Sequence, residues 1–346
     1  MWVLSLTACA VDVELTETTQ AIVDDGGCPT WGCGGNSPEI DTYGFHELHE
    51  LGAQNLEGFW IESVSRYGTP YDHPDVTGST LVVRNADGSV AVSANNIDGT
   101  IMRIRHALTG NLYELRVTAH ARMPYWADPT VTTPTYLLEW RQPIPDPSGT
   151  MPAWRNVCSH PGGINTDGWI NPGHAVLFDD DRIDAEHKIV TGQARNWFNI
   201  GCAGHALAKQ HLTGHTRAAS ATLGISTTYA DRTANLKMLA ADYCGTGHAF
   251  TVAGIDLHWR DRYGWYSTIG YGEAIEARWT ESGASCLNTP RVIASPTSLS
   301  VERFGTSLSD FQDALRAEGC LPRPCTPSTW GLAYPYDGAH VVSANY

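Results

Sequence analysis

The sequence lacks the features that mark common enzymes and nucleic-acid-binding proteins. It contains no G-x-S-x-G, G-x-x-x-x-G-K or G-x-G-x-x-G motif, which would indicate a serine nucleophile, a phosphate site or a dinucleotide site. Only 22 basic residues, three of them lysine, stand against 37 acidic ones, and the formal net charge is −15. Because phosphate binding needs a basic surface, we expect no nucleic-acid partner.

Long apolar runs and metal-binding motifs are also missing. No stretch of roughly eighteen apolar residues occurs, so the sequence predicts no transmembrane helix. HELHE sets His46 and His49 three residues apart, one short of the H-E-x-x-H spacing of zinc proteases. The acidic run FDDDRIDAEH lacks the glycine of an EF-hand loop and predicts an exposed turn. We therefore assign no catalytic residue, no metal site and no cofactor.

The first residues resemble the end of a bacterial lipoprotein signal. The chain opens MWVLSLTACA, where Leu6 stands three places before Cys9 and small residues adjoin the cysteine. No basic residue precedes Cys9, and the alternative is a buried strand that ends in cysteine. The polar, acidic segment that follows is typical of a flexible tether. We expect residues 1–27 to be a signal remnant and tether, Cys9 to be lipidated, and the protein to be anchored to the outer membrane, facing the periplasm or the cell surface.

Cysteine usage supports an oxidising compartment. Nine cysteines are present, and lipidation of Cys9 would leave eight, an even number that indicates disulfide bonds. Short turns in CPTWGC and CLPRPC suggest two pairs by proximity, and the three possible pairings of the other four stay open. The candidates are Cys28 with Cys33, Cys320 with Cys325, and the unassigned Cys158, Cys202, Cys244 and Cys286.

The N-terminal half predicts β-structure. STLVVRNADGSVAVSANN consists of two alternating apolar runs around Asp87-Gly88, a strong hairpin signal. NLYELRVTAHARM and TYLLEWRQP add alternating strands. Four prolines in RQPIPDPSGTMP, residues 141–152, suit neither a helix nor a central strand. We expect a β-rich N-terminal domain over residues 28–142 and a boundary at this segment.

The C-terminal half predicts strands with one or two helices. HAVLF, WFNIGC, AFTVAGIDLHW and EAIEARW are typical of strands. YADRTANLKMLAADYC has near-helical spacing and precedes Gly245, and SLSDFQDALRAEG begins at the capping residue Ser307 and ends at Gly319. We expect an α+β, β-dominated, disulfide-stabilised fold with a second domain over residues 153–292. A C-terminal extension, residues 293–346, would carry a short helix and the Cys320/Cys325 loop.

One segment resembles a known bacterial family. MLAADYCGTGHAFTVAGIDLHWRD, followed by IEARWTESGASCLNTPR, is similar to the ADYC domain. Upstream, WFNIGCAGHALAKQ aligns Cys202 with a family cysteine, and CPTWGCGGNSPEI with FHELHELGAQNLEGF resembles modules of exported myxobacterial-type proteins. The resemblance implies an exported, cysteine-stabilised domain without an assigned activity. The motif residues are Ala241, Asp242, Tyr243 and Cys244.

The resemblance also points to a difference. Family members often have cysteines at the positions of Gln210 and Asn235, and both are absent here. The joint absence implies a disulfide lost as a unit, which catalytic residues would not explain.

Cys244 has three interpretations. A catalytic thiol would need a nearby base, and His248 lies four residues away, although such pairs usually meet only in the fold. A metal site could draw on Cys202 and neighbouring histidines, but Gly214 weakens a helix through HLTGH. We favour a disulfide, because exported cysteines in even number are usually bridged. Asp242 and Tyr243 then have structural roles.

Two hypotheses for function follow. The first is an exported binding or structural module that contacts an envelope glycan or protein through aromatic residues in LHWRDRYGWYS. Core packing is the alternative role of those side chains, which are Trp259, Trp265 and Tyr266. The second is an exported hydrolase, with or without a metal ion. Its centre would be formed by Asp242, Cys244, His205, His211, His215 and His248.

Overall fold

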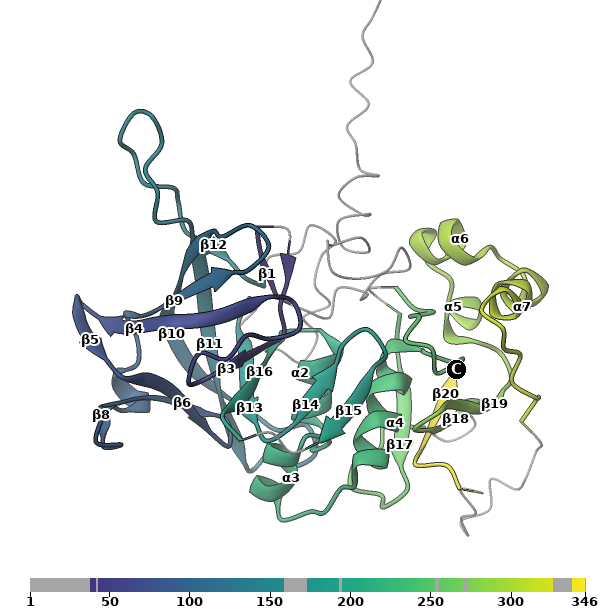
Figure 1. Cartoon of the computed structure of the whole chain (residues 1–346). Coiled ribbons are helices and arrows are strands. Elements are labelled where there is room, and N and C mark those ends of the chain that lie inside the picture. Colours follow the sequence, from purple (N-terminus) through teal and green to yellow (C-terminus); the bar gives the residue numbers. More distant parts are fainter. Residues whose placement is uncertain are drawn as a thin grey trace, which may run out of the picture.

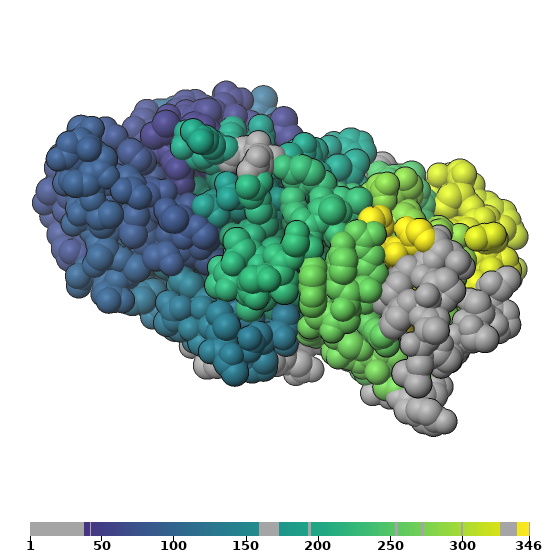
Figure 2. Space-filling view, turned by 90° about the horizontal axis from the view of Figure 1, so that it is seen from below, coloured from purple at the N-terminus to yellow at the C-terminus, as the bar shows by residue number. Residues whose placement is uncertain are grey.

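A computed structural model describes residues 38–41, 43–158, 173–192, 195–252, 255–270, 273–325 and 338–345. Strands dominate, short helices gather in the C-terminal half, and the predicted α+β, β-dominated, disulfide-stabilised fold is confirmed (Figure 1). The space-filling view shows an elongated molecule, with the N-terminal strands at one end and the C-terminal helices at the other (Figure 2).

The largest sheet has nine strands, and every adjacent pair in it is antiparallel. In spatial order the strands are β3 (Glu47–His49), β16 (Trp197–Cys202), β13 (Ala175–Asp179), β11 (Thr132–Arg141), β10 (Leu112–Pro124), β9 (Thr100–His106), β4 (Phe59–Arg66) and β5 (Thr69–Tyr71), with β12 (Arg155–Asn156) paired to β11. The strands predicted from NLYELRVTAHARM, TYLLEWRQP, HAVLF and WFNIGC are β10, β11, β13 and β16, and these predictions are confirmed.

Strands that precede and follow the Pro-rich segment in the sequence belong to this one sheet. β10 and β11 precede residues 142–154, while β12 and β13 follow them and pair with β11. The segment leaves the sheet as a loop (Figure 1). Its end is fixed because the guanidinium groups of Arg116 and Arg141 lie over the Trp154 ring, 4.0 Å and 4.2 Å from its centroid. The division into residues 28–142 and 153–292 stays a prediction, and no break in the sheet accompanies it.

The predicted hairpin is confirmed and belongs to a second sheet. That sheet contains β6 (His73–Thr77), β7 (Thr80–Arg84) and β8 (Val90–Val92), and the turn of the hairpin contains Gly88 with φ +81°. The backbone N–H of Val76 donates to Glu50, which attaches the small sheet to the chain near β3. Two short antiparallel pairs complete this part: β1 (Glu39–Ile40) with β2 (Tyr43–Gly44), and β14 (Arg182–Asp184) with β15 (Ile189–Gly192).

Strand β13 separates two hydrophobic cores. Val176 and Phe178 pack into a core shared with the helices, whereas Ala175 and Leu177 belong to the core of the N-terminal strands. Alternation along a strand places these pairs on opposite faces of the sheet. Both faces are therefore buried at this point.

Helices cover the C-terminal side of the sheet. Both predicted helices are confirmed: α4 starts with a capping box between Thr228 and Asp231, and α7 starts where Ser307 accepts the N–H of Asp310. The other described helices were not predicted. The elements are η1 (Ala94–Asn96), α2 (Ala206–Leu212), α3 (Arg217–Leu223), α4 (Tyr229–Ala240), α5 (Arg291–Ala294), α6 (Ser298–Phe304) and α7 (Leu308–Ala317).

The final strand of the chain lies inside a four-stranded sheet. The order is β17 (His258–Asp261), β20 (Val341–Asn345), β18 (Ala274–Thr280) and β19 (Gly283–Leu287). β20 pairs antiparallel with β17 on one side and β18 on the other, and the C-terminal residues lie against this region in Figure 2. The predicted strand over EAIEARW is confirmed as β18.

One strand prediction is wrong over most of its length. In AFTVAGIDLHW only the last residues belong to a strand, β17, and the described part of residues 249–257 has no regular structure. The segment turns instead: Phe250 donates its N–H to the carbonyl of Ala241, and its ring is fully buried. Its apolar side chains pack from an irregular backbone, so the apolar run did not indicate a strand.

The expected Cys320–Cys325 disulfide is wrong. Cys320 is bonded to Cys244, with Cα atoms 5.5 Å apart, and Cys325 is bonded to Cys286, with Cα atoms 4.9 Å apart. The third described disulfide joins the other two open candidates, Cys158 and Cys202. The expected Cys28–Cys33 pair and Cys9, which the sequence predicts to be lipidated, lie outside the described residues.

The physical reason lies in the neighbours of each cysteine. Cys320 follows α7 and donates its N–H to the carbonyl of Leu315, beside the motif loop. Cys325 is held at the end of β19, where Asn288 accepts its N–H at 2.9 Å. Proximity along the chain therefore did not decide the pairing.

Within the described part of the chain, no helix is both long and apolar enough to cross a membrane.

Candidate functional site

The motif Ala-Asp-Tyr-Cys forms the loop that ends α4. Ala241 has a left-handed backbone, with φ +53°, and is fully buried. Its carbonyl accepts the N–H groups of Tyr243 and Phe250. A small side chain keeps the cost of this conformation low, because a bulky residue would clash with the turn. The helix therefore ends at Ala240, five residues before Gly245, where the sequence suggested its end.

Asp242 forms a buried ion pair. Its carboxylate lies 2.8 Å from Nζ of Lys237, and both side chains are almost fully buried. The same carboxylate accepts the N–H of Gly247, while Lys237 also donates to the carbonyls of His187 and Gly245. A buried charge is stable only with such partners. The ion pair therefore closes the motif loop and joins it to the turn before β15.

Two glycines after the motif are required by close backbone contacts. Gly245 has φ +73°, and a Cβ atom there would lie 2.1 Å from the carbonyl oxygen of Ser282. Gly247 has φ +95°, and a Cβ atom would lie 1.9 Å from the carbonyl oxygen of Glu186. No other residue fits these positions without displacing the backbone. The structural motif therefore extends from Ala241 to Gly247.

Tyr243 reaches a buried carboxylate. Its hydroxyl donates to Glu276 at 2.5 Å, and Arg291 donates to the same carboxylate through Nε and Nη2, each at 2.9 Å. Burial would raise the pKa of Glu276, but the Arg291 guanidinium and the hydroxyls of Tyr243 and Ser343 hold that pKa below its ordinary value. Glu276 is therefore ionised and fully compensated.

The last strand completes this cluster. Ser343 lies in β20, is fully buried, and accepts a hydrogen bond from the indole of Trp279 at 2.8 Å. The ring of Trp279 stacks on Tyr243 with centroids 5.0 Å apart. The motif, β18, α5 and β20 therefore meet at one carboxylate, that of Glu276.

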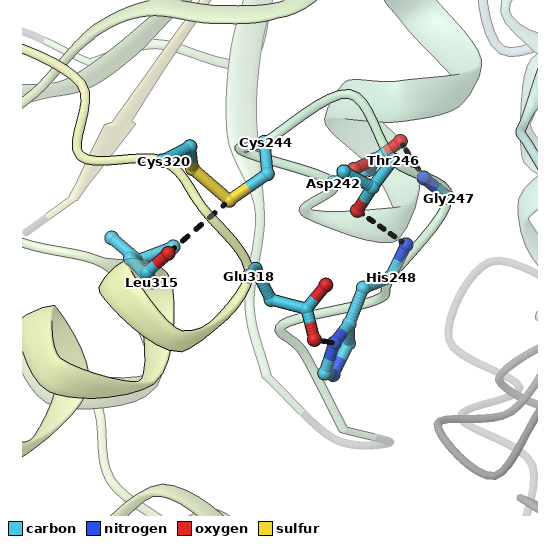
Figure 3. The surroundings of a disulfide bond; sticks show 8 residues. All are labelled: Asp242, Cys244, Thr246, Gly247, His248, Leu315, Glu318 and Cys320. Carbon is cyan, nitrogen blue, oxygen red and sulfur yellow. Dashed lines mark hydrogen bonds and ion pairs between the residues drawn. A yellow bond between two sulfur atoms is a disulfide. The ribbon is translucent and has the colours of Figure 1, made fainter.

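Cys244 joins the motif to the end of α7. Figure 3 shows its disulfide to Cys320, with His248 and Glu318 beside it. Nδ1 of His248 lies 2.6 Å from the Glu318 carboxylate, while burial lowers the pKa of His248. A sulfur in a disulfide offers no thiolate for attack or for metal binding. The favoured interpretation of Cys244 is confirmed, and the nucleophile and ligand interpretations are not supported in the oxidised protein.

The candidate histidines do not meet at Cys244. His211 is fully buried, and its Nε2 lies 3.1–3.2 Å from the hydroxyls of Ser79, Tyr125 and Thr133. Its Nδ1 lies 2.9 Å from the hydroxyl of Thr216. Burial lowers the pKa of His211 to about 3, so the ring is neutral near pH 7. It connects the β6–β7 turn, the residue that follows β10, strand β11 and the N-cap of α3 within the core.

The other candidate ligands have separate surroundings. His215 is buried edge-on against Trp259, 3.8 Å from Asp261, and His205 precedes α2 with only 9% of its surface exposed. α2 ends at Leu212, so His211 and His215 do not share one helix, as Gly214 suggested. Among the residues that the structure describes, no three His, Cys, Asp or Glu side chains could hold a metal ion together.

The aromatic candidates differ in burial: one belongs to the core, and another lies in an accessible stack. Trp259 is buried, with 3% exposed, and packs against the half-buried Tyr266 at 4.6 Å between ring centroids. Trp265 instead stacks on Tyr263, at 4.2 Å and 18° between planes, and Tyr263 is 42% exposed. Trp259 therefore belongs to the core, while Trp265 with Tyr263, which the sequence did not single out, forms an accessible stack.

A buried carboxylate fixes this aromatic turn. Asp261 accepts the backbone N–H groups of Tyr263, Trp265 and Tyr266 at 2.7–3.1 Å. Arg262 lies over the Tyr263 ring and forms an ion pair with Asp231 at 2.9 Å. The backbone of the turn is therefore held at three points, which restricts the arrangement of its rings.

Sequence inspection missed the partners of the motif. Lys237 was weakly indicated by the sequence, because it is one of three lysines and stands five residues before Asp242, in the last turn of the predicted helix. The sequence did not indicate Glu276 and Arg291, because they are charged residues distant from the motif along the chain. Gln210 and Asn235, the positions at which the resemblance implies cysteines, are buried on α2 and α4, respectively. Gln210 donates a hydrogen bond to the carbonyl of Arg232.

Fold and site together define a β-dominated, disulfide-bonded protein whose motif loop is a structural junction. The chain belongs to the ADYC domain family, which matches residues 73–293 and thus more than half of it. No curated protein and no solved structure gives a significant match. The match starts at β6 rather than at residue 153, and it ends inside α5, leaving Cys320, Cys325 and β20 beyond it.

Replacing Tyr243→Phe tests the junction. The ring packing remains, but Glu276 loses one hydrogen bond in the core. Hydrogen bonds to charged groups contribute about 1.5–3 kcal/mol, so we expect the free energy of unfolding to fall by that amount in urea titrations. The matched control is Tyr229→Phe, whose ring is 40% exposed and should change stability by less than about 0.5 kcal/mol. Equal losses in both variants would contradict the assignment.

The pH dependence of His211→Gln tests the buried neutral imidazole. In the unfolded chain the ring takes up a proton near pH 6.5, whereas in the fold it does so only near pH 3. Between these values the unfolded state binds more protons, so wild-type stability falls as pH falls, by about 1.4 kcal/mol per unit from this group. Urea titrations from pH 7.5 to pH 4 should show the variant losing less stability than the wild type. A constant difference would refute the neutral assignment.

Proposed function

We propose that this chain is an exported cell-envelope protein, anchored to the outer membrane by lipid at Cys9, and that it acts as a binding module. The observation that carries export is the state of the cysteines: all six that the structure describes are in disulfides. Such bonds persist in oxidising compartments and are rare in the cytosol. The acidic segment after Cys9 suits a tether to an anchored lipid.

A binding role is supported by what the motif residues do. Asp242, Tyr243 and Cys244 are each committed to a partner inside the protein, which leaves none of them directed at a substrate. The accessible feature is the stack of Trp265 on Tyr263, held on a rigid turn. Flat aromatic faces suit the C–H faces of sugar rings. The partner we propose is therefore a glycan of the cell envelope.

The anchor is tested with Cys9→Ala. The wild-type protein should sediment with membranes and yield an N-terminal peptide carrying lipid on the cysteine, because stable anchoring requires acyl chains. The variant should appear in the soluble periplasmic fraction with the same folded core. Thiol alkylation before reduction serves as the control for folding, since the described cysteines should stay unreactive in both proteins. Recovery of an unmodified, thiol-bearing Cys9 from wild-type protein would refute the anchor.

The binding role is tested with Trp265→Ala. The dissociation constant for isolated envelope polysaccharide should rise about tenfold, which corresponds to a loss of about 1.4 kcal/mol of binding free energy. The matched control is Tyr67→Ala, which removes another aromatic side chain, 76% exposed, in the turn between β4 and β5. Equal retention of both variants would place the binding surface elsewhere, and absence of retention by the wild type would refute a glycan partner.

A further inference from the structure

Two of the three described disulfides join cysteines that are not consecutive in the sequence. Cys158 and Cys202 are consecutive cysteines, and they are bonded to each other. The next four alternate: Cys244 is bonded to Cys320, and Cys286 to Cys325. The two C-terminal disulfides are therefore interleaved, with each closing a loop that contains one cysteine of the other.

Interleaved pairs are disfavoured while the chain is still unfolded. Cys320 and Cys325 stand five residues apart, whereas the native partners are 76 and 39 residues apart. Since closure of a flexible loop becomes rarer with about the 3/2 power of its length, the short pair meets about 60-fold more often than Cys244 with Cys320 and about 20-fold more often than Cys286 with Cys325. Oxidation before folding therefore favours Cys320–Cys325 and leaves Cys244 to pair with Cys286.

The folded structure holds the same cysteines with different partners. Cys320 ends the turn after α7, with its N–H on the carbonyl of Leu315. Cys325 is held against β19, where Arg323 accepts the N–H of Leu287 and Asn288 accepts the N–H of Cys325. Native packing thus stabilises the interleaved pairs that chain statistics disfavour.

We propose that folding of this chain passes through disulfide exchange and that the chain is a substrate for a dithiol disulfide isomerase. This partner rests on the proposed export, since such catalysts act where disulfides form. A catalyst thiolate attacks Cys325 in the Cys320–Cys325 bond, forming a mixed disulfide and releasing the Cys320 thiolate. That thiolate attacks Cys244 in the Cys244–Cys286 bond and releases the Cys286 thiolate.

The last step restores the catalyst. The Cys286 thiolate attacks Cys325 in the mixed disulfide, forms Cys286–Cys325 and expels the catalyst thiolate. The chain has two disulfides before the exchange and two after it, so no oxidant or reductant is consumed. In the product, Cys286 and Cys325 are 5% and 8% exposed, whereas Cys244 and Cys320 are partly accessible. Folding therefore buries the disulfide that the last step forms.

Refolding of the full chain tests the inference. The Cys9→Ala protein is reduced, unfolded, and oxidised on dilution either with ferricyanide, which supplies no thiol, or with reduced and oxidised glutathione. Peptide mapping should show most ferricyanide-treated molecules with Cys320 bonded to Cys325. Glutathione should replace that bond with the two native pairs, and a bacterial dithiol isomerase should accelerate the replacement. Quantitative native pairing with ferricyanide alone would overturn the inference.

Two double variants sharpen the result. In Cys286→Ser/Cys325→Ser, the competing Cys320–Cys325 bond cannot form and Cys244 and Cys320 become consecutive, so ferricyanide alone should give their bond in more molecules than in the wild type. The matched control, Cys158→Ser/Cys202→Ser, loses a consecutive pair and should still require thiol. The inference fails if ferricyanide gives no more of this bond in the first variant than in the wild type, or if the second variant does not require thiol. These measurements use purified protein, so they stand apart from the Cys9→Ala fractionation, whose failure would remove the anchor and leave the exchange result intact.

Discussion

The carboxylate of Glu276 holds the C-terminal half of this protein together. A buried ionised carboxylate is tolerated only when fixed donors surround it, and here donors from three elements, the motif loop, α5 and β20, reach a carboxylate that β18 carries. Tyr243 and Arg291 donate directly, and Ser343 connects the cluster to Trp279. Loss of any contributor leaves a buried charge partly unpaired. The position of the motif is therefore coupled to strands far away along the chain.

This constraint explains why the C-terminal segment is part of the domain. β20 lies between β17 and β18, and the disulfides at Cys320 and Cys325 attach the segment that precedes it to the motif and to β19. The family match ends at residue 293, before all three features. The matched region alone would expose two strand edges and leave two cysteines without partners. The interleaved pairing then follows from packing, since only the folded state places these cysteines together.

Function is supported by a different part of the same region. Ala241, Asp242 and Tyr243 are buried and Cys244 is in a disulfide, but the turn after β17 is accessible. Asp261 fixes the backbone of this turn, which carries the stack of Trp265 on Tyr263. Trp259 supports that turn from the core. An acidic protein with a preorganised aromatic surface suits an uncharged or weakly charged ligand such as a glycan better than a polyanion. β17 lies next to β20 in the four-stranded sheet, and β20 also pairs with β18, which carries Glu276, so the turn and the motif network share one sheet.

Local pattern determined much of this protein from sequence alone. Alternation predicted β10, β11 and the hairpin at Gly88, short strand-like segments predicted β13, β16 and β18, and capping residues predicted α4 and α7, because these signals act between neighbours in the chain. The motif and the presence of disulfides were also visible. Only the tertiary structure decided which cysteines pair, that Phe250 lies in an irregular loop, and that Glu276 and Arg291 complete the motif. These contacts join residues far apart in sequence, and packing of the whole chain selects them.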